Sequence, residues 1–279
     1  MKKIRLVGHS GCTLEVQQGD NGLVVVKTAT DPAYGERLKK QHQKQKNFKP
    51  GVFLTPLIFD THQDENGHFG FSMEYISGVT LAEHFGKIPI SSIKSIAQKF
   101  LSLVPKTHSF DPNAKAVFSA KIKNLKTKLR VIGDKDIAYA CGLLQKYEWK
   151  HCTSGECHGD MSLENIIWKN GDLYLIDFLD SFYDSWMMDL AKLLFDIESM
   201  WSYRNWNSVD TNLQTRLLIL KKILVDTISD LKNGQHLVRS IYHMALLHLL
   251  RILPYTKDSR TKKYLLVEMN RLCDIIETI

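Results

Sequence analysis

The hydrophobic pattern of the chain changes its period near residue 77, and this change restricts the possible folds more than any other feature. Before this point, short apolar and β-branched runs alternate with turn residues, which predicts strands over 4–7, 13–16, 23–27, 54–60 and 69–76. One polar helix is expected among them over 31–45, with Asp31 as its N-cap and Pro32 at its first position. We therefore expect a small antiparallel sheet in the first part of the chain.

Beyond residue 77 the apolar residues recur at helical spacing. Helices are expected near 91–104, 134–148, 187–200, 212–232, 236–252 and 261–278. One strand pair, 165–168 and 173–177, is expected among them around a turn at 169–172. This layout predicts an α+β fold with two lobes, residues 1–77 and 78–279, and a ligand site in the cleft between such lobes.

Composition limits the classes of partner. The 279-residue chain is 44% hydrophobic, as expected for an ordinary buried core. Its net charge of +7 favours anionic partners such as nucleotides, but no recognition motif accompanies the charge, so a nucleic-acid partner is not expected. No apolar run has the length of a membrane span, and the N-terminus lacks the apolar core of a signal peptide. We expect a cytoplasmic protein without a membrane partner, and the oligomeric state stays open.

The five cysteines are scattered and odd in number, which argues against a disulfide framework. The stretch from His151 to His158 contains two histidines and two cysteines, a composition that suggests zinc. However, the paired Cys-x-x-Cys spacing of structural zinc sites is absent, and His158 belongs to a second motif. Zinc is therefore not expected here.

That second motif is His-Gly-Asp-Met-Ser-Leu-Glu-Asn at 158–165, and it is followed by Asp177 at the end of an apolar strand. Phosphoryl transfer from ATP needs a carboxylate facing the acceptor hydroxyl, together with hard oxygen ligands for Mg²⁺. Asp160, Asn165 and Asp177 offer two carboxylates and an amide oxygen, and the intervening hairpin should bring Asp177 back beside the other two. The alternative is that Asp160 is a turn carboxylate and Asp177 caps a strand.

The pattern His-Gly-Asp-x-x-x-x-Asn, with the later Asp177-Phe178, resembles the aminoglycoside phosphotransferase and choline kinase superfamily. The segment 188–191, Met-Asp-Leu-Ala, is similar to the Asp-Leu-Ala helix of that family, whose Asp is usually structural. The motif match covers about residues 157–191, whereas the layout resembles the family over nearly the whole chain. The resemblance implies a protein-kinase-like fold, in which 1–77 is the nucleotide-binding lobe and 78–279 is the catalytic and acceptor-binding lobe.

The resemblance also implies an activity. It implies transfer of the γ-phosphate of ATP, with Mg²⁺, to a hydroxyl of a small molecule. Asp160 would be the catalytic base, Asn165 and Asp177 would bind the metal, and His158 would orient the loop. Two alternatives are a protein Ser/Thr kinase, against which the short interval from Asp177 to Asp189 argues, and a non-catalytic nucleotide-binding scaffold.

Phosphate contacts are expected from the first lobe. Lys27 matches the family lysine that reaches the α- and β-phosphates, although an exposed lysine at a strand end is the alternative. A turn after the first strand lies where a kinase places its phosphate-covering loop, and its free N–H groups could attract phosphate oxygens. The turn is Gly-His-Ser-Gly at 8–11, with Gly8, Ser10 and Gly11 as the expected nucleotide contacts, and an ordinary hairpin turn explains it almost as well.

Glu74 and Ile76 resemble the hinge of the family, where backbone groups bind adenine; an ordinary strand end is the alternative. One departure concerns the glutamate that usually pairs with the strand lysine. Here Glu36 stands early in the following helix, so either it pairs with Lys27 or a later glutamine of the helix replaces it with an uncharged contact.

The acceptor is expected to be neutral or anionic. Residues 201–279 contain twelve Lys or Arg and seven Asp or Glu, a net charge of +5, whereas a site for polycationic aminoglycosides should concentrate carboxylates. A sugar, or an amino alcohol with a balancing group, fits better, with surface-polysaccharide synthesis as one context. His243 and His248 are expected to be satisfied packing histidines, with a place in the acceptor pocket as the alternative.

Overall fold

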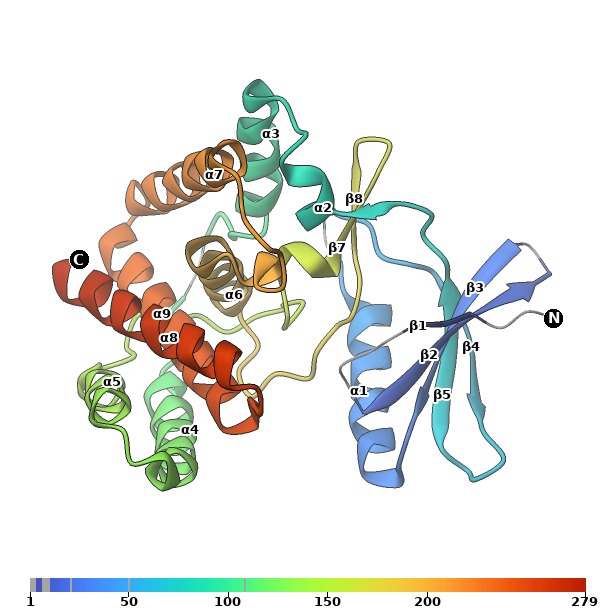
Figure 1. Cartoon of the computed structure of the whole chain (residues 1–279), viewed down its shortest axis with the longest axis horizontal. Coiled ribbons are helices and arrows are strands. Elements are labelled where there is room, and N and C mark those ends of the chain that lie inside the picture. Colours follow the sequence, from blue (N-terminus) through green and yellow to red (C-terminus); the bar gives the residue numbers. More distant parts are fainter. Residues whose placement is uncertain (1–3, 7–10, 21, 50, 108) are drawn as a thin grey trace. The chain divides into compact units, whose positions relative to one another are not determined.

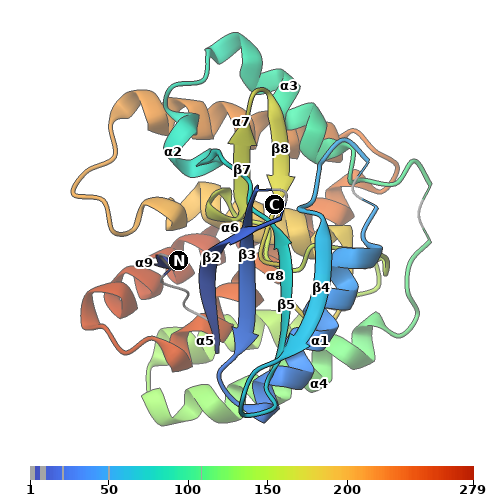
Figure 2. The ribbon, with the colours of Figure 1, turned by 90° about the vertical axis from the view of Figure 1, so that its right-hand side faces the viewer.

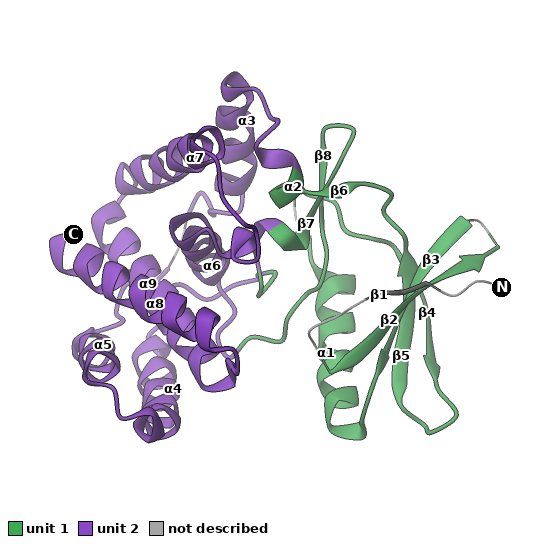
Figure 3. Ribbon diagram, in the orientation of Figure 1, with its two compact units in different colours: residues 1–83, 158–160, 164–181 green, residues 84–157, 161–163, 182–279 purple. Residues whose placement is uncertain are grey.

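The structure is a computed structural model that describes residues 4–6, 11–20, 22–49, 51–107 and 109–279 (Figure 1). The chain divides into two compact units (Figure 3). Unit 1 consists of residues 1–83, 158–160 and 164–181, and unit 2 of residues 84–157, 161–163 and 182–279. The lobe boundary expected at residue 77 stays a prediction. Within the described residues, no helix combines the length and the apolar character that crossing a membrane requires.

Unit 1 contains a five-stranded antiparallel sheet in the order β1-β2-β3-β5-β4 (Figure 2). Its strands are β1 (Ile4–Leu6), β2 (Cys12–Gly19), β3 (Gly22–Ala29), β4 (Ile58–Gln63) and β5 (Phe69–Glu74). Because β3 is the central strand, it is paired on both sides, and Lys27 lies opposite Leu14 on one neighbour and Phe71 on the other. The five predicted strands are therefore present, although the strand expected over 54–60 is found at Ile58–Gln63, and Lys27 lies on the central strand.

Helix α1 (Pro32–Asn47) begins where the sequence predicts. The carboxylate of Asp31 accepts the backbone N–H of Tyr34 at 2.8 Å, and Pro32 occupies the first turn, where a missing N–H has no consequence. The helix packs against β3 and β5 through Leu38, which is fully buried with Phe71 and Met73. This small core fixes the strand that carries Lys27.

A second, three-stranded sheet of unit 1 follows the order β6-β7-β8. It consists of β6 (Val79–Thr80), which the sequence pattern did not predict, β7 (Ile166–Lys169) and β8 (Asp172–Leu175). Asn170 and Gly171 both have positive φ, as a two-residue hairpin turn requires. The N–H of Leu54 donates to the carbonyl of Leu173 at 2.9 Å, and Leu54 accepts from Leu175 at 2.8 Å. The hairpin between Asn165 and Asp177 is thereby hydrogen-bonded to the segment that precedes β4.

Unit 2 is mostly helical. The boundary between the two units falls within the short helix α2 (Leu81–Phe85). The later helices are α3 (Ile90–Leu101), α4 (Ala114–Leu129), α5 (Lys135–Lys146), α6 (Trp186–Ser199), α7 (Thr211–Ser229), α8 (Gly234–Ile252) and α9 (Ser259–Thr278). Helices α6 and α8 pack on each other and are buried along nearly their whole lengths, so they form the centre of the unit. An Asp or Ser side chain caps the first turns of α5, α6, α7 and α9.

Helix α4 is absent from the sequence-based prediction, although a signal for it exists. Phe118, Ile122, Leu125 and Leu129 are buried and recur at helical spacing. The many lysines between them give the segment a polar composition that conceals this stripe. The other helices expected beyond residue 77 are confirmed, with ends that differ by a few residues.

His243 is a buried histidine of α8 whose Nδ1 is hydrogen-bonded. Its Nδ1–H donates to the carbonyl of Arg239 at 2.7 Å, and its ring stacks on Tyr147 with 3.8 Å between centroids. Burial lowers the pKa of His243 to about 4, because a charged imidazolium would lose its hydration. His248 is half-buried and contacts Phe195 edge to face. The packing role expected for both histidines agrees with these contacts.

The low pKa of His243 should make the protein less stable in mild acid. The unfolded chain takes up a proton near pH 6.5, whereas the folded chain resists it down to about pH 4. Stability is therefore lost as the pH falls between these two values, by up to about 3 kcal/mol. We expect His243→Gln to flatten the pH dependence of the urea unfolding free energy over this range. An equally steep dependence in the variant would contradict the assignment.

Candidate active site

Lys27 and Asp177 form an ion pair in unit 1, with 2.5 Å between Nζ and Oδ1. The Lys27 side chain is 4% exposed and that of Asp177 is 46% exposed. Burial disfavours the ammonium, but the charge of Asp177 outweighs this effect and raises the pKa of Lys27 above its ordinary value. Lys27 is thus held in the charged form beside a carboxylate that faces outward.

Asp177 has a left-handed backbone, with φ of 60°. Such conformations are uncommon outside glycine and tend to occur at functional sites. Lys27 uses Oδ1 of this carboxylate, and within the described part of the chain Oδ2 has no hydrogen-bond partner. A half-exposed carboxylate with an available oxygen is a suitable ligand for a hard cation.

Asp160 and Asn165 contact each other directly. The side-chain amide of Asn165 donates to the carbonyl of Asp160 at 2.8 Å and to its Oδ2 at 3.1 Å. Both bonds use the nitrogen of Asn165, so neither of them occupies its amide oxygen. The carbonyl of Asn165 accepts the N–H of Ile176 at 3.0 Å, which brings the residue before Asp177 to the same place. The structure therefore gathers Asp160, Asn165 and Asp177, as the motif predicts.

His158 is fully buried behind this group. Its Nε2 bonds the carbonyl of Ile176 at 2.7 Å, and its Nδ1 accepts the N–H of Asp160 at 3.2 Å. Only the tautomer with a proton on Nε2 makes both bonds. The ring also packs against Phe178, with 4.4 Å between centroids. His158 thus connects the loop of Asp160 with the strand end that carries Asp177.

Gly159 allows this close approach. Its φ is +90°, and a Cβ at this position would lie 2.3 Å from the carbonyl oxygen of Leu179. We expect Gly159→Ala to displace the adjacent Asp160 and to lower kcat by about 10²-fold. Gly171→Ala is a matched control, since Gly171 has a φ of +95° with nothing near the added methyl group. Its free energy of unfolding should fall by about 1 to 3 kcal/mol, and its kcat should be unchanged. Equal kcat values for both variants would show that the contact with Leu179 is unimportant.

Lys44 is a contact of the site that sequence reasoning missed. Lysines on a polar helix are ordinarily solvated, and Lys39 and Lys40 of α1 are indeed exposed. Lys44 is half-buried instead, and its Nζ donates to the carbonyl of Leu179 at 3.0 Å, two residues after Asp177. Nothing in the local pattern distinguishes it from its neighbours, because its partner lies far away in the sequence.

The structure does not bring Glu36 to Lys27. Because α1 begins at Pro32, Glu36 lies on the solvent side of an early turn, 74% exposed, and it pairs with Lys39 at 2.7 Å. Of the later glutamines, Gln45 donates to the carbonyl of Pro56 at 3.2 Å. Gln41 is buried, and its Oε1 has no hydrogen-bond partner among the described residues. The expected pairing of Glu36 with Lys27 is therefore wrong, because Lys27 bonds Asp177 and Glu36 bonds Lys39.

Of the expected glycine turn, Gly8 and Ser10 lie outside the described residues. Gly11 packs so tightly on Tyr34 that an added Cβ would lie 2.5 Å from its ring. The carbonyl of Gly11 accepts both the N–H and the hydroxyl of Thr30, at 3.0 and 2.9 Å. These contacts account for the glycine structurally, and its role toward a nucleotide stays a prediction.

The expected hinge follows the end of β5. The N–H of Glu74 donates to the carbonyl of Leu57 at 2.8 Å, and its carboxylate accepts the N–H of Leu57 at 3.3 Å. Ile76 is buried, and among the described residues no backbone carbonyl accepts its N–H. Adenine recognition needs an available backbone N–H, and Ile76 offers one just beyond the inner strand β5, but this assignment also stays a prediction.

Asp196 is a second residue that the motif does not reveal. This fully buried carboxylate of α6 accepts the N–H of Leu163 at 2.6 Å, and the N–H and hydroxyl of Ser202 at 2.7 and 2.6 Å. Leu163 stands between Asp160 and Asn165 in the sequence. A carboxylate inside the apolar run 193–197 could have indicated such an anchor, since buried charges need hydrogen bonds. Asp189 of the same helix is buried as well, as expected of a structural residue.

The metal-binding capacity of the site is small but fits Mg²⁺. In the described residues, no three His, Cys, Asp or Glu side chains are grouped as a metal site would require. Magnesium is usually held by one or two carboxylates together with phosphate oxygens of the substrate. Asp177 with its available Oδ2, and Asn165 with its amide oxygen, are ligands of this kind.

Solved structures share this fold at low sequence identity. A thermostable mutant of aminoglycoside phosphotransferase APH(4)-Ia, in a ternary complex with ADP and hygromycin B, superposes with a TM-score of 0.62 at 14% identity, over 99% of this chain and 93% of that one. Choline kinase from Cryptosporidium parvum Iowa II gives 0.60 at 9% identity, over 99% and 89%. ADP-bound aminoglycoside phosphotransferase APH(2'')-Ib gives 0.54 at 16%, over 98% and 92%. The predicted α+β, kinase-like fold is confirmed.

The sequence itself gives a closer assignment. No curated protein matches the chain. The model of the phosphotransferase enzyme family, APH, matches residues 5–219, well over half of the sequence and the whole span from β2 to the residues around Asp160 and Asp177. The chain therefore belongs to the phosphotransferase enzyme family.

Proposed function

We propose that the protein transfers the γ-phosphate of ATP to a hydroxyl group of a small molecule, with Mg²⁺ as its cofactor. The observation that carries this proposal is the grouping of Asp160, Asn165 and Asp177 in unit 1, with Lys27 bonded to Asp177. In this proposal residues 1–77 bind the nucleotide and residues 78–279 bind the acceptor, and the protein acts in the cytoplasm.

Asp160 is the catalytic base in this scheme. Asn165 donates to Oδ2 of Asp160 and so orients the carboxylate, which in this scheme accepts the proton of the acceptor hydroxyl. Little covalent chemistry falls to the protein in phosphoryl transfer, so orientation and charge are its main contributions. Asn165 orients the base, and His158 fixes the backbone on which the base stands.

Charge is supplied by Lys27 and by the metal ligands. The raised pKa of Lys27 keeps its ammonium charged, so that it can offset the negative charge of the nucleotide phosphates. Asn165 and Asp177 would hold Mg²⁺, which when bound neutralises charge on the phosphate oxygens. Gly8, Ser10 and Gly11 would cover the phosphates, while Glu74 and Ile76 would bind adenine through their backbones.

A neutral or anionic acceptor suits the charge of the C-terminal part of the chain. Residues 201–279 carry twelve basic and seven acidic side chains. The fold relatives include a complex with ADP and hygromycin B and a choline kinase, which supports a nucleotide and a small polar molecule as the two substrates. Within that class the charge favours sugars, and amino alcohols with a balancing acidic group, over polycations.

A screen of small molecules tests the proposal. Wild type and Asp160→Asn would each be incubated with ATP, Mg²⁺ and panels of sugars, amino alcohols and aminoglycosides, with ADP release as the readout. The proposal predicts at least one hydroxyl compound that stimulates ADP release by the wild type only. Silence with every compound, combined with intact nucleotide binding, would favour a non-catalytic nucleotide-binding protein.

A further inference from the structure

Helix α4 is rich in positive charge. It contains no acidic residue and five lysines, which are Lys115, Lys121, Lys123, Lys126 and Lys128. Lys121 and Lys128 are seven residues apart, so they lie on one face of the helix, two turns from each other. Lys121 is half-buried, whereas Lys123 is exposed. One face of α4 therefore presents two cations, of which one is partly withdrawn from solvent.

Phe182 brings a third cation to this face. The Nζ of Lys121 lies 4.9 Å from the centroid of the Phe182 ring, and the guanidinium carbon of Arg251, on α8, lies 5.1 Å from the same centroid. The ring is itself held edge to face by Phe118 of α4, at 5.5 Å between centroids. Because both cations lie over one fixed ring, they are close neighbours although they come from different helices.

Tyr255 connects Lys128 to the same group. The ammonium of Lys128 donates to the Tyr255 hydroxyl at 3.0 Å and lies 5.6 Å from the centroid of its ring. The hydrogen bond and the charge of Lys128, followed by the charges of the other two cations, lower the pKa of the Tyr255 phenol, so all three cations act at one place. We call these five side chains, Lys121, Lys128, Phe182, Arg251 and Tyr255, the cation cluster.

No carboxylate balances the lysines of the cation cluster. Burial lowers the pKa of Lys121, and the charges of Arg251 and Lys128 lower it further. Among the described residues, the Tyr255 phenol acts in the opposite direction but no carboxylate does, and neither lysine forms an ion pair with an acidic side chain. Like charges that are held together in this way repel one another, so an anion bound among them would stabilise the folded protein.

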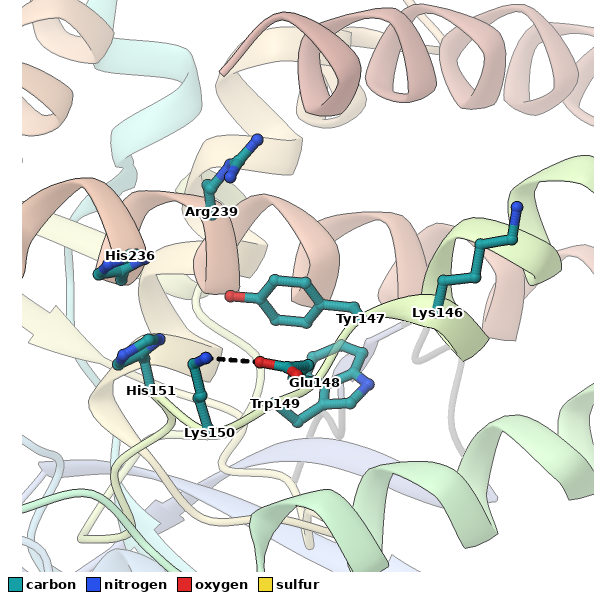
Figure 4. Close-up of a pocket in the computed structure, with 8 residues that line it drawn as sticks. All are labelled: Lys146, Tyr147, Glu148, Trp149, Lys150, His151, His236 and Arg239. Carbon is teal, nitrogen blue, oxygen red and sulfur yellow. Dashed lines mark ion pairs between the residues drawn. The ribbon is translucent and has the colours of Figure 1, made fainter.

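A second basic region of unit 2 differs from the cation cluster. It is a pocket of about 220 Å³ between the loop after α5 and the first turns of α8 (Figure 4). Its Lys150 is paired with Glu148 at 2.6 Å. In Figure 4 the guanidinium of Arg239 points away from the two histidine rings. The charges of this pocket are partly balanced and do not gather at one place, so it offers less to an anion than the cation cluster does.

The cation cluster is close in the chain to the proposed catalytic residues. Phe182 follows Asp177 by five residues, which an extended chain spans in at most about 18 Å. Two residues further, the carbonyl of Asp184 accepts the N–H of Gly155 at 2.9 Å, and its carboxylate accepts the thiol of Cys157 at 3.2 Å. Cys157 directly precedes the His-Gly-Asp motif. The segment that carries Phe182 is therefore hydrogen-bonded to the segment that leads into the proposed catalytic loop.

We propose that the acceptor of phosphoryl transfer carries an anionic group, which Lys121 and Arg251 bind beside the ring of Phe182. In terms of the proposed function, on which this rests, the acceptor is a sugar acid or a sugar phosphate rather than a neutral sugar. An ammonium and a guanidinium offer several N–H donors to the oxygens of a carboxylate or a phosphate ester. The ring offers an apolar surface to the carbon atoms of the same molecule. Both cations are half-buried, which suits a small ligand better than an extended surface such as a membrane.

Matched acceptors test this assignment, with ADP release at saturating ATP and Mg²⁺ as the readout. Glucose, glucuronate and glucose 6-phosphate would be compared with one another, as would the three corresponding galactose compounds. We expect an anionic compound to have a kcat/KM at least about tenfold above that of its neutral parent, and the two anionic series distinguish a carboxylate from a phosphate ester. Lys121→Gln should raise the KM for that compound by about tenfold, because a charge-assisted hydrogen bond is lost, and should leave kcat and the KM for ATP unchanged.

Lys123→Gln is the matched control, because Lys123 is an exposed lysine of the same helix outside the cation cluster. This variant should keep the wild-type KM for the anionic compound. A neutral sugar that is phosphorylated as efficiently as its anionic counterparts would overturn the proposal. An unchanged KM in Lys121→Gln would overturn it as well, since the anionic group would then be bound elsewhere.

Binding of inorganic phosphate separates the anion site from the proposed function. Titration calorimetry would use the full-length protein saturated with Mg²⁺ and a non-hydrolysable ATP analogue. We expect phosphate binding that Lys121→Gln weakens by about tenfold and that Lys123→Gln leaves unchanged. Equal phosphate binding by Lys121→Gln and the wild type would overturn the anion site, and phosphorylation of a neutral acceptor would then still support the proposed function. Phosphate binding that depends on Lys121, without ADP release from any sugar, amino alcohol or aminoglycoside, would confirm the anion site but contradict both the proposed function and the acceptor role.

Discussion

Replacing Asp160 with asparagine should lower kcat by about 10³-fold while leaving the affinity for Mg²⁺ and nucleotide nearly unchanged. The substitution keeps the shape of the side chain and can still accept the hydrogen bond that Asn165 donates to Oδ2. It removes the proton acceptor but none of the proposed phosphate or metal contacts at Lys27 and Asp177. Activity should be measured as ADP release with an acceptor from the screen, and nucleotide affinity by isothermal titration calorimetry.

Asp180→Asn is a matched control for this experiment. Asp180 follows the strand end of the site within the same unit, and its ionic contact with Lys40 is a long one, at 3.7 Å. Its variant should therefore keep the kcat of the wild type. An Asp160→Asn enzyme with wild-type kcat would show that another group accepts the proton, and loss of nucleotide affinity instead of kcat would show that Asp160 acts in binding.

The parts of the site that could be predicted from sequence are those specified by local chemistry. The Asn170-Gly171 turn determines the hairpin, and the pairing of its two strands returns Asp177 to Asn165. This geometry depends on residues within the hairpin. The Asp31-Pro32 start of α1 is equally local. In both cases the residues that determine the geometry are neighbours in the sequence, so the local sequence pattern is enough to predict the structure.

The parts that could not be predicted depend on partners far apart in the sequence. Glu36 and Lys44 stand on one basic helix, and only the packing of α1 decides that Glu36 faces solvent and that Lys44 reaches the carbonyl of Leu179. Asp196 shows its function only through Leu163, which precedes it by more than thirty residues. The stacked rings of His151 and His236 likewise come from two segments that no motif connects.

Asp177→Asn should have a different result from Asp160→Asn, because Asp177 is proposed to bind metal and is also the partner of Lys27. We expect the Mg²⁺-dependent part of the nucleotide affinity to fall by about 100-fold, as expected when a metal site loses a charged ligand. Titration of an ATP analogue with and without Mg²⁺ measures this effect. Asp172 is the exposed first residue of β8 in the same hairpin, and Asp172→Asn should leave both affinities unchanged.

Asp177→Asn should also destabilise the fold. The loss of stability reports on the pairing with Lys27, whereas the loss of Mg²⁺-dependent affinity reports on the proposed metal binding. The substitution leaves the buried ammonium of Lys27 without a carboxylate, at a cost of about 1 to 3 kcal/mol once the exposure of Asp177 is considered. Adding Lys27→Met removes the stranded charge, so the double variant should recover stability in urea unfolding but not Mg²⁺-dependent binding. If stability and metal-dependent binding were both restored, Asp177 would serve only to neutralise Lys27 and could not be a metal ligand.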